Sequence, residues 1–139
     1  MDQAITAVVT NLLRLGAYLA REGDRLLHEM KISQQEFVVL MAIKEEQPVS
    51  QTQMCAEFLF EKSNMSKIVR RLTDGGLIEV SYAPTDRRVR LLRVSTEGQR
   101  TVNRCMSVLD DWNRQWLATL SQAELEETSS NLKRLLSCC

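Results

Sequence analysis

The feature that most restricts the fold of this sequence is a serine followed three residues later by glutamate or glutamine. In that spacing the two side chains satisfy free backbone N–H groups at the start of a helix. The pairs are Ser33 with Glu36, Ser50 with Gln53, and Ser121 with Glu124. They predict three helix starts. The helix that starts at Ser33, with Phe37 and Leu40 on its buried stripe, ends before Pro48.

Helical spacing of apolar residues predicts three more helices. The first runs from about residue 3 to about residue 29, and Leu12 and Leu19 lie on its apolar face. A helix over residues 62–74 carries Met65 and Leu72 on one side. Ser95 can cap a long helix that follows it. Short joints connect these helices, so we expect them to pack against their neighbours in sequence.

Strand-forming residues appear only between the fourth and fifth helices. Gly75 and Gly76 end the fourth helix, and residues 77–82 and 89–94 are rich in residues that favour strands. The segment from Ala83 to Asp86 forms the turn. The order of elements therefore predicts a mainly α fold with a small β-hairpin wing, which is a winged helix-turn-helix flanked by long N- and C-terminal helices.

The length of 139 residues fits a single domain. Within residues 1–139 we expect a winged helix-turn-helix DNA-binding region over 31–95, with its recognition helix at about 62–74 and its wing at about 78–94. Residues 1–30 and 96–139 are predicted to be dimerisation helices. Their apolar surface exceeds what a small winged domain can cover, and a bundle within one chain is the alternative.

The formal net charge is zero, which at first argues against a nucleic-acid partner. The charges are unevenly distributed, however. Residues 61–94 contain eight basic and four acidic side chains, a formal charge of +4, and the remainder carries −4. The neutral total therefore conceals a basic segment that coincides with the predicted recognition helix and wing.

The predicted recognition helix has small polar side chains near its start, followed by lysine and arginine. Such side chains can reach base edges or neutralise phosphates. Two arginines at the tip of the hairpin can enter a minor groove. A solvated basic face and an ordinary charged turn are the alternatives. The candidate DNA-binding residues are Ser63, Asn64, Ser66, Lys67, Arg70, Arg71, Arg87 and Arg88.

With these residues in view, the sequence resembles the MarR (multiple-antibiotic-resistance regulator) family of bacterial transcription factors. Asp86-Arg87-Arg88 resembles the D-x-R wing of that family, and Val94-Ser95-Thr96-Glu97-Gly98 resembles its L-T-x-x-G helix start. Residues 72–78 resemble the exit of the recognition helix. The resemblance implies that Asp86 braces the wing and that Arg88 enters the minor groove. Val80, where the family often has a basic residue, departs from the pattern.

The four cysteines lack the spacing of a zinc site or of a disulfide framework. We expect no metal, no cofactor and no catalytic residue, since the chain also lacks a glycine-rich phosphate loop. The first helix lacks the cysteine of the peroxide-sensing members of the resembled family. Any redox response is therefore expected at the terminal pair Cys138 and Cys139, with Cys105 as a further candidate.

The function predicted from these features is sequence-specific DNA-binding transcriptional regulation by a homodimer. The resemblance implies a repressor that is released from an inverted-repeat operator in double-stranded DNA by a small-molecule effector or by thiol oxidation. The alternative is a winged-helix protein–protein interaction module without DNA binding. No apolar run is long enough to span a membrane and no secretory signal is visible, so we expect a cytoplasmic protein that is not an enzyme.

Overall fold

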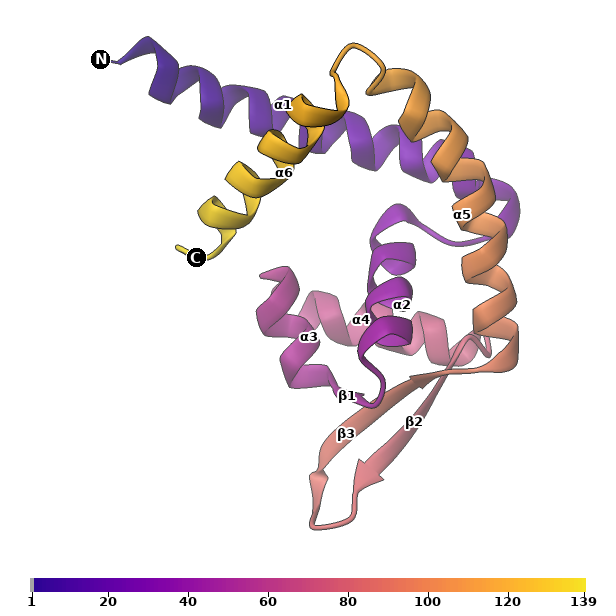
Figure 1. Cartoon of the computed structure of the whole chain (residues 1–139). Coiled ribbons are helices and arrows are strands. Elements are labelled where there is room, and N and C mark those ends of the chain that lie inside the picture. The colour runs from indigo at the N-terminus through magenta and orange to yellow at the C-terminus, as the bar shows by residue number, and fades with distance from the viewer. Residues whose placement is uncertain (1) are drawn as a thin grey trace. The chain divides into compact units, whose positions relative to one another are not determined.

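The computed structural model describes residues 2–139. The elements, labelled in Figure 1, are α1 (Gln3–Leu27), η1 (His28–Met30), α2 (Gln34–Glu46), β1 (Val49–Ser50), α3 (Gln51–Phe58), α4 (Lys62–Asp74), β2 (Ile78–Ala83), β3 (Asp86–Val94), α5 (Thr96–Trp116) and α6 (Gln122–Leu136). They form two compact units, Met1–Val108 and Leu109–Cys139. The boundary between the units falls within α5.

The predicted fold class, a mainly α protein with a hairpin wing, is confirmed. The capping boxes at Ser33, Ser50 and Ser121 are all formed, with both the side-chain and the backbone hydrogen bond present. The helix predicted over residues 62–74 is α4. The helix predicted from about residue 3 to about residue 29 is α1, continued by one short 3₁₀ turn. Local capping and apolar spacing were sufficient to locate these helices.

The core of the first unit is built around α4. Its residues Met65 and Val69 are completely buried, and Leu72 is almost completely so. Helix α4 contacts the helices α2 and α3, and it also contacts the strand β2 that follows it in the chain. The side chains of Leu40 and Ile43 on α2 are also fully buried. Burial of this apolar stripe fixes the rotation of α4, and so determines which of its side chains remain exposed.

The strands form a three-stranded antiparallel sheet with the order β1-β3-β2, in which β1 precedes α4 and the hairpin β2-β3 follows it. Ile78 of β2 lies opposite Val94 of β3, and Val49 of β1 lies opposite Leu92. The long strands β2 and β3 extend away from the helices as a hairpin (Figure 1). The buried Leu92 side chain joins the central strand to the core. The base of the hairpin is therefore fixed, and its tip is free to contact a partner.

The sheet differs from the sequence prediction in two respects. The second strand of the hairpin begins at Asp86, three residues before the predicted start at residue 89, because Ala83 already pairs with Asp86 across the turn. The strand β1 was not predicted at all. It has only two residues and is held by pairing with β3, and such a short segment carries no period of its own.

The junction between α4, the hairpin and α5 is tightly hydrogen-bonded. Gly76, with a φ of 73°, ends α4 in the left-handed conformation that favours glycine. The hydroxyl of Ser95 donates to the carbonyl of Gly76 (2.5 Å) and accepts from the N–H of Gly98 (3.0 Å). Ser95 thus caps α5, as predicted. A Cβ at Gly98 would collide with the carbonyl oxygen of Leu77, so this position requires glycine.

The second unit contains the end of α5 and the whole of α6. The rings of Trp112 and Trp116 pack with centroids 5.9 Å apart, and the Trp116 indole N–H donates to the side-chain amide oxygen Oδ1 of Asn113 at 3.0 Å. Helix α6 begins at the Ser121 capping box and has no buried residue. Its Leu132 and Leu136 side chains are exposed.

Helix α1 presents an apolar face to the outside of the first unit. The residues Ile5, Val8, Val9, Leu12 and Leu15 recur at helical spacing, and each is between 42% and 66% exposed. Only the last part of the helix, from Gly23 to Leu27, contains buried residues. Within residues 2–139 no helix is long and apolar enough to cross a membrane.

Candidate nucleic-acid interface

The polar face of α4 is opposite its buried stripe, so the candidate residues on it are available to a partner. Ser63, Ser66 and Lys67 are exposed, and so are Arg70 and Arg71, while Asn64 is half-buried. The helix has no side-chain cap at Glu61, so the first N–H groups of α4 lack a capping partner from that side chain. Free N–H groups and the helix dipole at such an end favour a phosphate.

The tip of the wing holds Arg88 in a defined orientation. The carboxylate of Asp86 accepts hydrogen bonds from the Arg88 backbone N–H (3.0 Å) and from its Nε (3.2 Å). These two contacts lower the pKa of the Asp86 carboxyl below its ordinary value of 3.8, the backbone bond having the larger effect. The Arg88 side chain is nevertheless 91% exposed. Asp86 is therefore placed to brace the wing, which is the role inferred from the resemblance.

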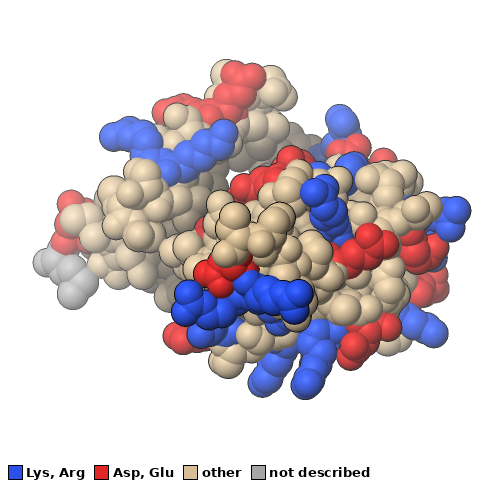
Figure 2. Space-filling model, turned by 90° about the horizontal axis from the view of Figure 1, so that it is seen from below, with Lys and Arg blue, Asp and Glu red and all other residues tan. Residues whose placement is uncertain are grey.

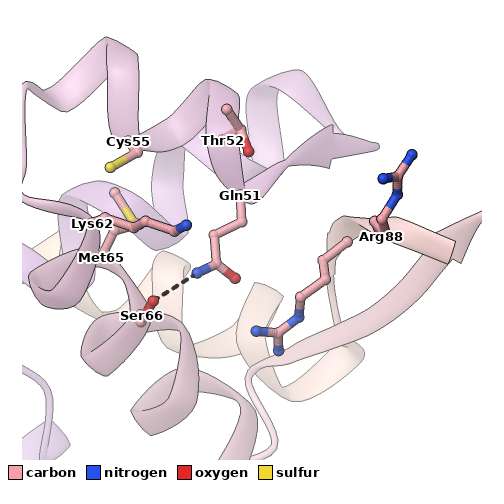
Figure 3. A pocket seen from close by; sticks show the side chains of 8 residues that line it. Gln51, Thr52, Cys55, Lys62, Met65, Ser66 and Arg88 are labelled. Carbon is pink, nitrogen blue, oxygen red and sulfur yellow. Dashed lines mark hydrogen bonds between the residues drawn. The ribbon is translucent and has the colours of Figure 1, made fainter. Parts of the chain in front are cut away.

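Helices α3 and α4 and the strand β3 line one cavity of about 440 Å³ (Figure 3). Ser66 of α4 accepts a hydrogen bond from the Gln51 side-chain amide at 3.1 Å, drawn as a dashed line. The other amide atom, Gln51 Oε1, is buried without a hydrogen-bond partner among residues 2–139. The cavity is lined by Gln51, Thr52, Cys55, Lys62, Met65, Ser66, Arg88 and Arg90.

A second cavity, of about 490 Å³, lies next to the first and is lined by later turns of α4. Three of the predicted residues, Ser66, Lys67 and Arg70, line it together with Thr73, Asp74 and Arg90. Arg90 of β3 belongs to both cavities. Ser63, Asn64, Arg71 and Arg87 line neither of them. Four of the eight predicted DNA-binding residues therefore line at least one of the two cavities.

Basic side chains stand out from the side of the molecule on which the wing projects. Figure 2 views that side from below and shows groups of lysine and arginine side chains, with acidic side chains between some of them. Arg87, Arg88 and Arg90 of the wing and Lys67, Arg70 and Arg71 of α4 are all exposed. The formal charge of +4 over residues 61–94 is thus carried largely by solvent-accessible groups.

Sequence reasoning did not assign Gln51, Cys55, Lys62 or Arg90 to the site. Lys62 and Arg90 were counted only as part of the basic segment. Gln51 and Cys55 belong to α3, which comes before the recognition helix and carries no basic residue of its own. Their contribution depends on how α3 packs against α4, and the spacing of residues along the chain does not show it.

The candidate redox cysteines have different environments. Cys138 and Cys139 are exposed in the second unit, and Cys105 is fully buried on α5. Burial raises the pKa of the Cys105 thiol above its ordinary value of 9.0. A thiol in this state is a poor nucleophile at neutral pH. Within residues 2–139 no cluster of three or more His, Cys, Asp and Glu side chains is placed to hold a metal ion.

The fold and the basic face together define a class. A short helix, a turn, a second helix with exposed polar and basic side chains, and a hairpin with an exposed arginine at its tip form a winged helix-turn-helix of the kind that binds DNA.

Comparison with known proteins shows which members of this class the chain resembles. Residues 31–89 match the model of the MarR family. The chain is 24% identical over 109 residues to the HTH-type transcriptional regulator BilQ of Clostridioides difficile, covering 78% of this chain and 74% of BilQ. Over residues 31–89 the chain is therefore similar to the MarR family, and the curated relatives it resembles are HTH-type transcriptional regulators.

Solved structures show the same fold over the whole chain. The transcriptional regulator BldR of Sulfolobus solfataricus superimposes with a TM-score of 0.91 at 20% identity, and 100% of each chain is covered. MepR of Staphylococcus aureus, solved in complex with DNA, superimposes with a TM-score of 0.79 at 20% identity, covering 94% of this chain and 97% of MepR.

Proposed function

We propose that this protein is a homodimeric repressor that binds an inverted-repeat operator in double-stranded DNA. The observation that carries the proposal is the placement of Arg88 and Ser66 on one cavity, because a wing and a recognition helix on the same face can contact adjacent grooves. The structure of MepR bound to DNA supports this use of the fold.

Each candidate residue has a proposed task at the interface. Ser63, Asn64 and Ser66 face the base edges of the major groove, and Lys67, Arg70 and Arg71 contact bases or phosphates. Arg88 enters the minor groove with Asp86 holding its backbone, and Arg87 contacts the backbone of the DNA beside it. The acidic remainder of the chain disfavours approach to DNA in other orientations.

Dimerisation is supported by the exposed apolar face of α1. Single exposed apolar residues are common on monomers, but a row such as Ile5, Val9 and Leu12 on one helix face marks an interaction site. A second copy would bury this face in a two-fold interface and present two recognition helices about one turn of DNA apart. That arrangement predicts an inverted-repeat operator.

The test is DNA binding measured by fluorescence anisotropy at several salt concentrations. The probe is a duplex selected by the protein from a random pool. We expect affinity to fall steeply as salt rises, and Arg88→Gln to weaken binding by about 1–3 kcal/mol, or roughly fivefold to more than a hundredfold. Arg25→Gln, in which an exposed arginine is removed from α1, is the matched control.

Two outcomes would contradict the proposal. If no duplex is enriched from the pool at low salt, the protein does not bind DNA specifically, and the winged-helix protein–protein interaction module becomes the better reading. If Arg25→Gln weakens binding as much as Arg88→Gln, net charge rather than the wing governs the affinity.

Release from DNA is proposed to follow either a small-molecule effector or oxidation of the terminal cysteines. The exposure of Cys138 and Cys139 supports the second route, whereas the burial of Cys105 makes its participation depend on local opening. Peroxide titration of operator binding with the Cys138→Ser, Cys139→Ser double variant tests the terminal pair. Unchanged sensitivity of that variant to peroxide would exclude it.

A further inference from the structure

A hydrogen bond between α3 and α4 restricts what one of the candidate base-contacting side chains can do. Figure 3 shows the Gln51 side chain reaching from the start of α3 to Ser66 on the recognition helix α4. The Gln51 amide Nε2 donates to the Ser66 hydroxyl oxygen at 3.1 Å. Ser66 therefore acts as a hydrogen-bond acceptor toward its own protein.

The hydroxyl proton of Ser66 has no acceptor among the described residues 2–139. Serine and threonine hydroxyls inside helices commonly donate to the backbone carbonyl four residues earlier. Thr73 does so on the same helix, where its hydroxyl donates to the Val69 carbonyl at 2.7 Å. Ser66 makes no such bond to the carbonyl of Lys62. Its proton is therefore available to an acceptor on a partner molecule.

Ser66 is accessible on the face that we propose binds DNA. The residue is exposed, and it lines both cavities next to α4, together with Arg90 of β3. Lysine and arginine side chains line the same two cavities. Contacts from such cations to phosphates fix the position of a DNA duplex, so that neighbouring side chains can read its bases. The Ser66 hydroxyl is thus held through its oxygen at a place that a base edge can reach.

We propose that Gln51 makes Ser66 a hydrogen-bond donor toward DNA, so that the base facing Ser66 must carry a major-groove acceptor. Guanine offers N7 and O6, adenine offers N7 and thymine offers O4, whereas cytosine offers only its N4 amino donor. Cytosine is therefore the base that Ser66 rejects. Gln51 is a positioning residue in this recognition.

The second lone pair of the Ser66 oxygen does not remove this preference. A cytosine amino group could donate to that lone pair, but the hydroxyl proton would then stay unpaired in a desolvated interface. An unpaired buried donor costs more free energy than one added hydrogen bond contributes. The inference rests on the proposed function for its DNA partner, while the hydrogen bond between Gln51 and Ser66 does not.

The first experiment measures that hydrogen bond in the free protein. The side-chain amide protons of Gln51 are compared between the wild type and Ser66→Ala in heteronuclear NMR spectra of the full chain. A donated N–H resonates downfield of a free one, so we expect a Gln51 amide proton to move upfield in Ser66→Ala. The amide protons of Gln53 are the control, because Gln53 accepts from the Ser50 N–H through its oxygen. Unchanged Gln51 resonances would overturn the proposal.

The second experiment measures base preference. Duplexes are selected from a random pool by the wild type and by Ser66→Ala, and the operator position at which their preferences differ is the one that Ser66 contacts. We expect the wild type to bind a duplex with cytosine at that position roughly threefold to tenfold more weakly than one with the preferred base. Ser66→Ala should lose this discrimination.

Variants of Gln51 test whether this residue determines the preference. An ionised glutamate offers only acceptors, so in Gln51→Glu the Ser66 hydroxyl donates to the protein and offers its lone pairs to the DNA. We expect that preference to reverse toward cytosine, and Gln51→Met to give an intermediate preference. Gln53→Glu is the matched control, since it adds the same charge to α3 and keeps the capping-box spacing to Ser50. Its base preference should equal that of the wild type.

The possible failures can be distinguished. If no duplex is enriched, the proposed function fails and base reading by Ser66 fails with it, while the NMR comparison still decides the hydrogen bond. If duplexes are enriched, operator binding stands, and three results would each refute the inference. These are equal preferences of the wild type and Ser66→Ala, a wild-type preference for cytosine at the position that depends on Ser66, and a wild-type preference retained in Gln51→Glu.

Discussion

Helices α1 and α4 are both amphipathic, but they differ in what covers the apolar face. On α4, Met65 and Val69 are completely buried by the rest of the first unit. On α1, Ile5 is 66% exposed and Leu12 is 42% exposed. The periodicity of a helix therefore shows that an apolar face exists and does not show which partner covers it. For α4 the partner is this chain, and for α1 we propose a second copy.

The largest effect is expected from placing charges on the open face of α1. Val8 and Leu12 lie one helical turn apart on that face. In a two-fold dimer, Val8→Glu with Leu12→Glu introduces four buried charges, and the lost apolar burial alone is about 6 kcal/mol at roughly 1.5 kcal/mol per side chain. We expect monomers in analytical ultracentrifugation, with the helix content of the protein retained.

If the double variant sediments like the wild type, α1 is not the dimer interface. The charges should also weaken operator binding, because separate monomers cannot engage both half-sites at once.

A substitution on the buried face of α4 should change the stability of the protein and not its assembly. Leu72→Ala removes a side chain that is 1% exposed and should lower the free energy of unfolding by about 2–5 kcal/mol, measured by urea denaturation. Leu13→Ala on α1 removes the same atoms from a side chain that is 71% exposed. We expect that control to cost less than about 0.5 kcal/mol, since Leu13 lies beside the apolar row.

Two glycines provide a third comparison, because Gly98 is buried and Gly16 on α1 is exposed. Gly98→Ala forces a Cβ against the carbonyl of Leu77 and should destabilise the first unit by about 1–3 kcal/mol in thermal unfolding. Gly16 on α1 has nothing within 4 Å of an added Cβ. Gly16→Ala should therefore stabilise α1 by about 0.5–1 kcal/mol through helix propensity.

A loss of stability in Gly16→Ala that appears only at concentrations where the protein is dimeric would indicate that a second copy packs closely at this glycine.

The smallest effect is expected from the side chain of Glu57 on α3. Burial raises the pKa of Glu57 above its ordinary value of 4.5, and a hydrogen bond to Glu46 and the nearby charges of Glu46 and Glu45 raise it further. Its contribution to stability is complete below pH 4.5 and is lost as pH rises through the raised pKa. Glu57→Gln should therefore stabilise the protein at pH 7, by up to about 0.5 kcal/mol, and make no difference near pH 4.

Glu124 provides a comparison of opposite sign. Hydrogen bonds at the Ser121 capping box lower the pKa of Glu124, so its contribution is present above pH 4.5 and is lost as pH falls. Glu124→Gln should reduce the loss of stability that occurs as pH falls below 4.5. Glu57→Gln should reduce the loss of stability that occurs as pH rises above 4.5. Equal behaviour of the two variants in pH-dependent urea unfolding would contradict the assignment of both carboxyl groups.

Most of the fold could be predicted because its helix ends are determined locally. Ser33, Ser50 and Ser121 each cap the helix that follows, as the spacing to Glu36, Gln53 and Glu124 predicted. The strand β1 was not predicted, because Val49 and Ser50 form a strand only through pairing with Leu92 and Leu91. That pairing depends on how α2 places the chain against the sheet.

The candidate site was only partly predictable for the same reason. The basic residues of α4 and of the wing follow from composition and periodicity. The cavity that joins Gln51 and Cys55 to Ser66 and Arg88 forms only when α3, α4 and β3 pack together. Neither the thiol nor the unpaired amide oxygen has a signature in the sequence, because both are ordinary residues on a short helix.

The hydroxyl of Ser95 connects two elements that are otherwise separate in function. It binds the Gly76 carbonyl at the end of the recognition helix and the Gly98 N–H at the start of α5, and the Ser95 N–H donates to the Leu77 carbonyl at 3.0 Å. The C-terminal end of α4 and the N-terminal end of α5 are therefore expected to open to solvent together. The amide protons of Ser95 and Gly98 should exchange with deuterium at a common rate, and a displacement of the start of α5 is transmitted to the end of α4 through both the hydroxyl and the backbone N–H of Ser95.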